Sequence, residues 1–555
     1  MTRPMRIAII LLLAVCVLAP VGLVVYQSFL DGAFFAPRTA FTLSAYEFVF
    51  DDDDFYDALR NSFIIAAGMT AIAVPVGAML AFLLVRTDLP GRRGIEQLVL
   101  VPMFVSSVVL AFGFVVSLGP VGIVSLWARS IFGVVPWSIY SLPSLVLIAG
   151  LTHVPHVFLY ASAALRSLGS DVEEAARTTG AGPLRVALTV SLPMILPNLL
   201  YCGVLVFFLG FELFGLPLVL GDPEGILVLA TYLYKLTNKL GVPSYQLMAV
   251  VVVVIIVIAL PLVAMQRQLL KTANRYVSVR GKAAAQRPIG LGAWRWPALG
   301  LIAAWLLFTV VLPVVGLVLR SFLSGWGEGV SILGALTLAH FQELAGFPNL
   351  IRGIVNTLLL ASVGGAVSVA VYTAVNLAGH RWVSRWTWLL DVVVLLPRAM
   401  PGLVAGLAVF WVFLFVVPLQ PLRQTLVALW AAYTVVWLAY GMRLVSGALL
   451  QIGPELEEAG RTVGATAGRV SRDVTLPLIR AGLFGSWVLI FITFVREYST
   501  GVYLLSPGTE VIGSLLVSLW GTGAIDLVTA LSTVNIAMIG GGLLLMRRFG
   551  QRAGQ

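Results

Sequence analysis

The sequence predicts an all-α, polytopic membrane protein with about twelve transmembrane helices. Of its 555 residues, 59% are hydrophobic and only 11% are charged, and the mean hydropathy is +0.99. A soluble domain has about 25% charged residues, so these figures exclude an ordinary cytosolic enzyme and a disordered chain. Because a membrane-spanning helix needs about 20 apolar residues, the length leaves room for about a dozen spans joined by short loops.

Hydropathy places these spans along the chain. The segment Pro120–Ser141 is also apolar, but two prolines and Arg129 argue against a full span. We expect it to be a loop, without a helix, that touches the outer membrane surface. The twelve spans are expected at Met5–Phe29, Asn61–Val85, Ile95–Leu118, Leu142–Leu165, Asn198–Leu220, Gln246–Met265, Trp296–Leu319, Asn356–Gly379, Leu389–Val417, Leu426–Leu450, Gly482–Leu505 and Leu527–Met546.

The distribution of charges predicts how the chain is oriented. With the N-terminus inside, most Lys and Arg residues fall in inner segments, as the positive-inside rule requires, and the acidic run Asp51–Asp54 falls outside. We therefore expect a multi-pass protein of the bacterial inner membrane with both termini in the cytoplasm. Asp51–Asp54 is expected to be solvated or to contact a basic rim on a partner. Cys16 and Cys202 both lie in apolar stretches, so no disulfide framework is expected.

The chain contains an internal duplication. Asn61-Ser62 recurs as Asn356-Thr357, 295 residues later, whereas matches further along are displaced by 284 residues. The difference indicates eleven extra residues in the first half, and these fall in Pro120–Ser141. Each half has an even number of predicted spans, so the two repeats enter the membrane from the same side, as in parallel-repeat transporters. We expect a first repeat at 1–265, a cytoplasmic linker at 266–295 and a second repeat at 296–555.

One cytoplasmic loop occurs in both halves, at 170–197 and 453–480. In each copy an acidic helix ends at a glycine, a second amphipathic stretch follows, and Leu-Pro opens the next span. Gly180 and Gly464 favour a tight turn, and the glutamates suit a helix N-terminus. A surface helix resting on lipid headgroups would also be amphipathic, but two copies with the same spacing favour a dedicated docking device.

These loops resemble the Glu-Ala-Ala…Gly…Leu-Pro motif of type I permeases in importers of the ATP-binding-cassette class. In that family the loop is a coupling helix that docks on a cytoplasmic ATPase subunit. The second copy has Gly460 in place of the second alanine. The motif residues, which the resemblance assigns to ATPase coupling, are Glu173, Glu174, Ala175, Ala176, Gly180, Leu192 and Pro193 in the first copy, and Glu457, Glu458, Ala459, Gly460, Gly464, Leu476 and Pro477 in the second.

The resemblance implies partners for this chain. Two copies of the motif imply one fused permease that serves two ATPase subunits. The resemblance also implies a periplasmic or lipid-anchored protein that delivers the substrate. The sequence has no Gly-x-x-x-x-Gly-Lys-Ser/Thr motif, so we expect ATP and Mg to be bound by the partner chains and no cofactor by this one. Membrane lipid is the other expected partner, and nucleic acid is not expected.

Ionisable residues within predicted spans are candidates for the translocation pathway. Packing between charged groups that hold the helices together explains them equally well. His153 and His156 have a spacing that could suit a metal, but core packing explains them better, and we expect no metal site. The pathway candidates are Glu212, Arg398, Arg496, Glu497 and Tyr498.

The sequence says less about the substrate than about the class of protein. The stretch from Arg496 to Val511 resembles ferric-iron permeases, which makes ferric iron the first hypothesis. Thiamine, aminoethylphosphonate and polyamines are handled by similar fused permeases and stay as alternatives. A proton-coupled transporter of the major facilitator type also has two parallel repeats, and Arg86–Arg93 superficially resembles its signature. That family has no paired Glu-Ala-Ala loops.

Overall fold

In the computed structural model, every named element of secondary structure in the described residues is a helix, and the β-pairing there is limited to three isolated bridges. The described residues are 3–33, 39–168, 171–238, 244–275, 288–326, 330–331, 333–382, 384–399 and 402–553. The chain forms two compact units that do not coincide with the sequence repeats. One unit, here called the second-half unit, comprises Met1–Val49, Gly241–Ile256 and Ala339–Gln555. The other, the first-half unit, comprises Phe50–Leu240 and Val257–Leu338.

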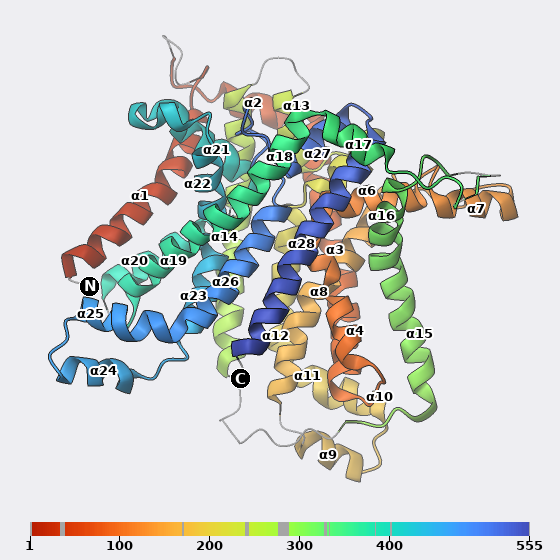
Figure 1. The fold of residues 1–555 in the computed structure, drawn as a ribbon, viewed down its shortest axis with the longest axis horizontal. Helices are drawn as coiled ribbons and strands as arrows, with labels where there is room; N and C mark the ends of the chain where they lie inside the picture. Colours follow the sequence, from red (N-terminus) through yellow and green to blue (C-terminus); the bar gives the residue numbers. More distant parts are fainter. Residues whose placement is uncertain are drawn as a thin grey trace. The chain divides into compact units, whose positions relative to one another are not determined.

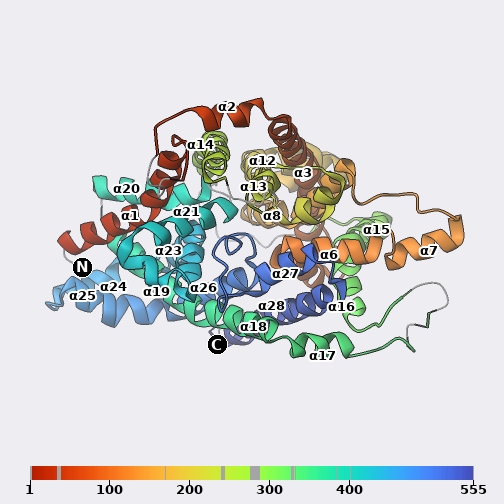
Figure 2. The same ribbon diagram turned by 90° about the horizontal axis from the view of Figure 1, so that it is seen from above.

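The second-half unit contains the first helix of the chain. Helix α1 (Arg3–Gln27) packs against α19, α20 and α21 of the second repeat. Figures 1 and 2 show α1 beside these helices. The other elements of this unit are α2 (Ser44–Asp51, to Val49), α17 (Ala339–Gly346), α18 (Pro348–Leu359), η6 (Leu360–Gly364), α19 (Gly365–Gly379), α20 (Arg385–Leu395), η7 (Leu396–Ala399), α21 (Gly402–Phe415), η8 (Val417–Leu422), α22 (Leu426–Val436), α23 (Leu438–Leu449), α24 (Pro454–Thr462), α25 (Ala467–Val470), η9 (Ser471–Thr475), α26 (Leu476–Arg496), α27 (Ile512–Gly521) and α28 (Ile525–Ala553).

The first-half unit has the reciprocal arrangement, because it contains the helix that opens the second repeat. That helix runs through α15, η5 and α16 and packs against α6. The elements of this unit are α3 (Asp53–Arg86), α4 (Arg92–Val99), α5 (Val101–Phe104), α6 (Ser107–Leu118), α7 (Ile123–Phe132), α8 (Leu142–Ser167), α9 (Asp171–Thr178), α10 (Pro183–Val186), η1 (Ala187–Ser191), α11 (Leu192–Met194), α12 (Leu196–Phe211), η2 (Pro217–Gly221), η3 (Asp222–Glu224), α13 (Leu229–Asn238), η4 (Gly292–Trp294), α15 (Arg295–Leu306), η5 (Leu307–Val315) and α16 (Gly316–Ser321), while α14 (Tyr245–Arg275) contributes to both units.

A small-residue contact allows the packing of η5 on α6. A side chain at Gly113 would collide with the backbone of Pro313, so only glycine allows the two helices this approach. About one turn further along α6, the hydroxyl of Ser117 donates a hydrogen bond to the carbonyl of Leu312 in η5. This contact explains why the first helix of the second repeat belongs to the first-half unit.

Most of the predicted spans are confirmed. Within the described residues, nine helices are long and apolar enough to cross a membrane, and eleven if each of two bent pairs counts as one span. The bent pairs are Ala187–Met194 with Leu196–Phe211, at 68°, and Leu426–Val436 with Leu438–Leu449, at 65°. The fold class predicted from the sequence, an all-α polytopic protein built from two repeats, is therefore correct.

Two predicted spans are wrong in the same way. The chain breaks near Pro102 in the span expected at Ile95–Leu118, and near Pro397 in the one expected at Leu389–Val417. A proline lacks the N–H group that a continuous helix needs. In both halves a four-residue helical turn contains the proline, and a new helix starts at Ser107 or Gly402, which are 295 residues apart.

Other boundaries also differ from the prediction. The segment Pro120–Ser141 is not a loop without a helix, because it contains α7, which leaves the bundle sideways in Figure 1. The spans expected to end at Leu220 and Leu505 end at Phe211 and Arg496. The first ten residues of the predicted linker continue α14.

The Asn-Ser/Thr repeat has a structural role in each unit. In the second-half unit, the amide of Asn356 donates to the carbonyls of Gly508 (3.0 Å) and Glu510 (2.9 Å), and Thr357 accepts from the first N–H of α27 (2.9 Å). In the first-half unit, Asn61 donates to Leu227 (3.0 Å) and Ser62 accepts from Leu229 at the start of α13 (2.9 Å). The pair therefore fixes the loop before an equivalent helix in both halves.

Candidate functional site

The two predicted loops have the same backbone. In the first-half unit, α9 ends at a turn on Gly180, and α10 and η1 lead into α11 and α12. In the second-half unit, α24 ends at Gly464, and α25 and η9 lead into α26. Gly180 and Gly464 have φ angles of +86° and +83°, and a side chain at either would meet open space. Glycine is favoured there by the left-handed backbone conformation and not by crowding.

The first loop is anchored to its unit by a buried ion pair. Glu173 in α9 is only 5% exposed, and its Oε1 accepts a hydrogen bond from Arg86 Nε at 2.9 Å. The hydroxyl of Ser191 donates to the same oxygen at 2.7 Å. Arg86 is the last residue of α3, so the pair ties the loop to the end of a long span. Hydrogen bonds between charged groups are stronger than neutral ones, which makes this pair the main polar anchor of α9.

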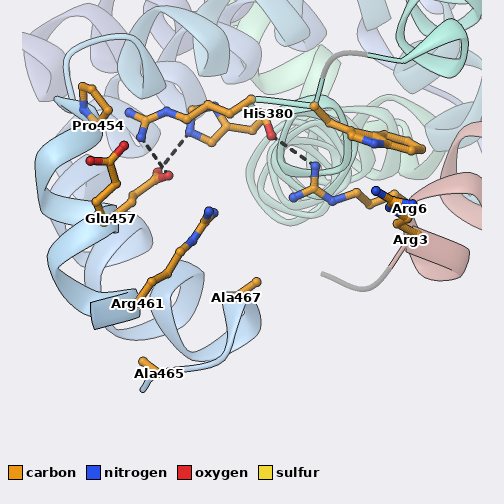
Figure 3. A pocket seen from close by; sticks show the side chains of 11 residues that line it. Arg3, Arg6, His380, Pro454, Glu457, Arg461, Ala465 and Ala467 are labelled. Atoms are coloured by element: carbon orange, nitrogen blue, oxygen red, sulfur yellow. Dashed lines mark hydrogen bonds and ion pairs between the residues drawn. The ribbon is translucent and has the colours of Figure 1, made fainter. Parts of the chain in front are cut away.

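The second loop repeats this anchor with one addition. Glu457 is 4% exposed, and its Oε2 lies 3.0 Å from Arg381 Nη1. Its Oε1 accepts from Thr475 Oγ1 at 3.3 Å and lies 3.0 Å from Nε2 of His380 (Figure 3). Glu457 therefore has three partners where Glu173 has two.

The two anchors share an arginine, a glutamate and a hydroxyl residue, and only His380 has no counterpart, because Val85 occupies the matching position. Arg86 and Arg381 are 295 residues apart, while the glutamates and the hydroxyl residues, Ser191 and Thr475, are 284 apart. These are the two displacements of the sequence repeat. Sequence analysis counted Arg86 and Arg381 only as basic loop residues and missed their role, although their recurrence at the repeat spacing was a signal that could have revealed it.

The remaining motif residues lie on the outside of the loops. Glu174 is half-buried and Glu458 is exposed, each next to its buried neighbour. Ala175 and Ala459 are exposed, while Ala176 and Gly460 are half-buried. A methyl group at Gly460 would lie 3.1 Å from the side chain of Val470, which explains the departure from alanine in this copy. Leu192-Pro193 and Leu476-Pro477 each open the helix that follows, with proline in its first turn.

Among the pathway candidates, Glu497 has the most complete environment. Its Oε1 accepts hydrogen bonds from the N–H and hydroxyl groups of Ser499 and Thr500, at 2.9–3.1 Å, and its Oε2 accepts from Trp437 Nε1 at 2.9 Å. The guanidinium of Arg496 lies over the ring of Trp437, 5.7 Å from its centre. Five neutral donors of the described residues therefore satisfy this buried carboxylate. The pathway role of Arg496 and Glu497 stays a prediction.

Two of the other candidates lie near helix ends. Glu212 is half-buried at the C-terminal end of α12, and Tyr498 is half-buried next to Gly513 of α27. The side chain of Arg398 lies outside the described residues. His153 and His156 stack with their ring centres 5.4 Å apart. Across the described part of the chain, no three His, Cys, Asp or Glu side chains are grouped as metal ligands would be.

Two repeated bundles with a duplicated, anchored loop define a transporter permease, and the comparison of the sequence with known families agrees. Residues 73–274 and 366–552 match the model of the binding-protein-dependent transport system inner membrane component. The chain belongs to this family. It is thus a multi-pass membrane subunit of an importer that works with a substrate-binding protein.

The relatives of this chain are not all named for the same substrate. The chain is 27% identical to a probable ABC transporter permease protein, y4fN, of Sinorhizobium fredii, over 82% of this chain and 80% of the relative. It is 22% identical to the ferric transport system permease protein FbpB of Actinobacillus pleuropneumoniae, over 96% and 76%. It is 30% identical to the molybdenum transport system permease protein ModB of Escherichia coli, over 28% of this chain and 67% of that protein.

Proposed function

We propose that this chain is a transmembrane part of an importer whose two loops couple it to a pair of ATP-hydrolysing subunits. The observation that carries this proposal is the duplicated anchor, in which Glu173 and Glu457 hold the two loops in the same way on two different units. A helix that only rested on lipid would not need a buried, charged anchor at matching positions. ATP and Mg would be bound by the partner subunits, and both chain termini would lie in the cytoplasm with the loops.

The proposed mechanism is alternating access. Closure of the ATPase pair would pull on the two loops, and the buried anchors would transmit this movement to α3 and to the segment after α19. Because Glu173 and Glu457 are buried in the two anchors, the exposed surface of each loop that meets the ATPase would include Glu174 or Glu458. Hydrolysis and release of the subunits would return the pathway to its inward-facing state.

The coupling role is tested by reversing the charge of the two outer glutamates. We expect the Glu174→Lys/Glu458→Lys double variant to insert normally and to lose copurification with its ATPase subunits. Glu343→Lys, an exposed charge reversal on α17 away from the loops, is the matched control and should retain them. Normal ATPase retention and normal transport by the double variant would contradict the coupling role.

We propose ferric iron as the substrate to test first, on the basis of the stretch from Arg496 to Val511 and the similarity to a ferric transport permease over most of the chain. Thiamine, aminoethylphosphonate, polyamines and molybdate are the alternatives. Uptake of radiolabelled ferric iron should fail in a strain lacking this chain and return only with the wild-type gene. Unchanged iron uptake in a strain without other iron importers would discard iron and leave the importer class in place.

A further inference from the structure

A basic pocket lies against the second coupling loop, within the second-half unit. It has a volume of about 620 Å³ and is lined by the start of α1, the segment after α19, and the residues of α24 and α25 (Figure 3). Four arginines line it, against two glutamates. They are Arg3, Arg6, Arg381 and Arg461.

Two of these arginines have a hydrogen-bond or ion-pair partner among the described residues, and two have none. Arg381 pairs with Glu457, and Arg6 donates to the backbone carbonyl of His380 at 3.2 Å. Among the described residues, the side chains of Arg3 and Arg461 form no hydrogen bond or ion pair. Figure 3 shows Arg461 extending toward the space between Glu457 and Arg6. The pocket therefore holds two arginines that no described residue of the chain pairs with.

The pocket lies at the end of a helix that faces lipid. Leu12 and Val15 of α1 are 66% and 62% exposed, and Met5, next to Arg6, is also exposed. Arginines at the end of such a helix lie at the depth of the lipid headgroups. Basic pockets between transmembrane helices on the cytoplasmic side suit anionic lipid headgroups. This placement rests on the cytoplasmic location of the loops in the proposed function.

The equivalent place in the first half lacks two of the four arginines. Ser28-Phe29-Leu30 recurs as Ser321-Phe322-Leu323, and at this displacement of 293 residues Arg3 and Arg6 correspond to Trp296 and Leu299, while His380 corresponds to Val85 at a displacement of 295. Arg461 does have a counterpart, Arg177, which is exposed on the first loop. The second loop thus has two arginines beside it, Arg3 and Arg6, for which the first loop has no basic residue at the matching positions.

We propose that this pocket binds a phosphate group, supplied by the headgroup of an anionic phospholipid. The phosphate would bridge Arg461 on the coupling loop and Arg3 on α1, since guanidinium groups bind phosphate through paired, charge-assisted hydrogen bonds. Binding would brace α24 against α1. A soluble phosphate has the same chemistry and is the other source that the experiment must distinguish.

The test is native mass spectrometry of the purified full chain in detergent, without ATPase subunits. We expect phosphatidylglycerol to be retained in preference to phosphatidylcholine. Binding should weaken roughly fivefold for each of Arg3→Gln and Arg461→Gln, because one arginine near an anionic surface contributes about that factor. Arg177→Gln makes the same charge change on the first loop and should have no effect.

Several outcomes would overturn the proposal. No preference for phosphatidylglycerol would do so, as would an equal loss in Arg177→Gln. Displacement of the lipid by inorganic phosphate at millimolar concentration would assign the site to a soluble anion instead. If Arg461→Gln left lipid binding unchanged but weakened ATPase copurification, the arginine would belong to the ATPase contact. Since lipid binding is measured without ATPase, failure of the coupling role would leave this result intact.

Discussion

The buried anchor of the first loop gives the most quantitative prediction. Replacing Arg86 by Met removes the cation and leaves the Glu173 carboxylate buried, with Ser191 as its one remaining side-chain partner among the described residues. Breaking a buried ion pair from one side costs about 3–5 kcal/mol, because the remaining charge is uncompensated. Both side chains of this pair are at most 6% exposed, so the full cost applies. We therefore expect Arg86→Met to lose about 3–5 kcal/mol of unfolding free energy.

The second anchor should be less sensitive. The side chain of Arg381 is 30% exposed, so water can replace part of its interaction. Glu457 also keeps His380 and Thr475 when Arg381 is removed. The loss should then be that of one hydrogen bond to a charged group, about 1.5–3 kcal/mol. Two anchors that are equivalent in sequence are thus expected to differ in energy because of burial and number of partners.

The assay is denaturant unfolding in mixed micelles, with limited proteolysis of each loop as a local readout. Arg177→Met is the control, since Arg177 is exposed on the same loop and should change stability by no more than about 0.5 kcal/mol. The double variant Arg86→Met/Glu173→Gln should recover much of the loss, because no buried charge remains. The reasoning fails if Arg86→Met resembles the control, or if Arg381→Met is the more damaging change.

Three further predictions follow from local geometry. Gly464→Ala should destabilise the second loop by about 1–2 kcal/mol because of the positive φ at Gly464, whereas Gly468→Ala nearby should not; equal effects in denaturant unfolding would refute this. Gly113→Ala should cost about 1–3 kcal/mol by forcing α6 away from Pro313, while Gly300→Ala, which meets open space, should be neutral in the same assay. The bidentate hydrogen bonds from Arg352 lower the pKa of Glu510 to about 2, below its ordinary value of 4.5. The stability lost in Glu510→Gln should therefore be constant above about pH 5 and shrink as the pH falls toward 2; a difference that persists at pH 2 would contradict the ion pair.

Hydropathy and the repeat together predicted most of the architecture, because long apolar stretches and recurring motifs are local signals. The breaks at Pro102 and Pro397 were missed because a window average over an apolar stretch does not register one lost hydrogen bond. Helix α7 was missed because prolines flank it without interrupting it. Short helices lie in both segments that were expected to be loops, and their coupling role stays a prediction. Their anchors were not, since Arg86 and Glu173 are 87 residues apart and meet only through tertiary folding.

The exchange of first helices limits what each sequence repeat can do by itself. Helix α1 packs on the helices of the second repeat, and η5 packs on α6 of the first, through a contact that only glycine at position 113 allows. A single repeat would therefore expose the apolar groove that the other repeat's first helix fills. It would also leave its own first helix without that packing. In membranes, close packing is a main driving force for helix association. A single repeat would therefore be less stable, because it lacks the packing between its helices and the exchanged first helix. Joining the repeats in one chain keeps each first helix near its groove, because a covalent link replaces an encounter between separate chains with an intramolecular one.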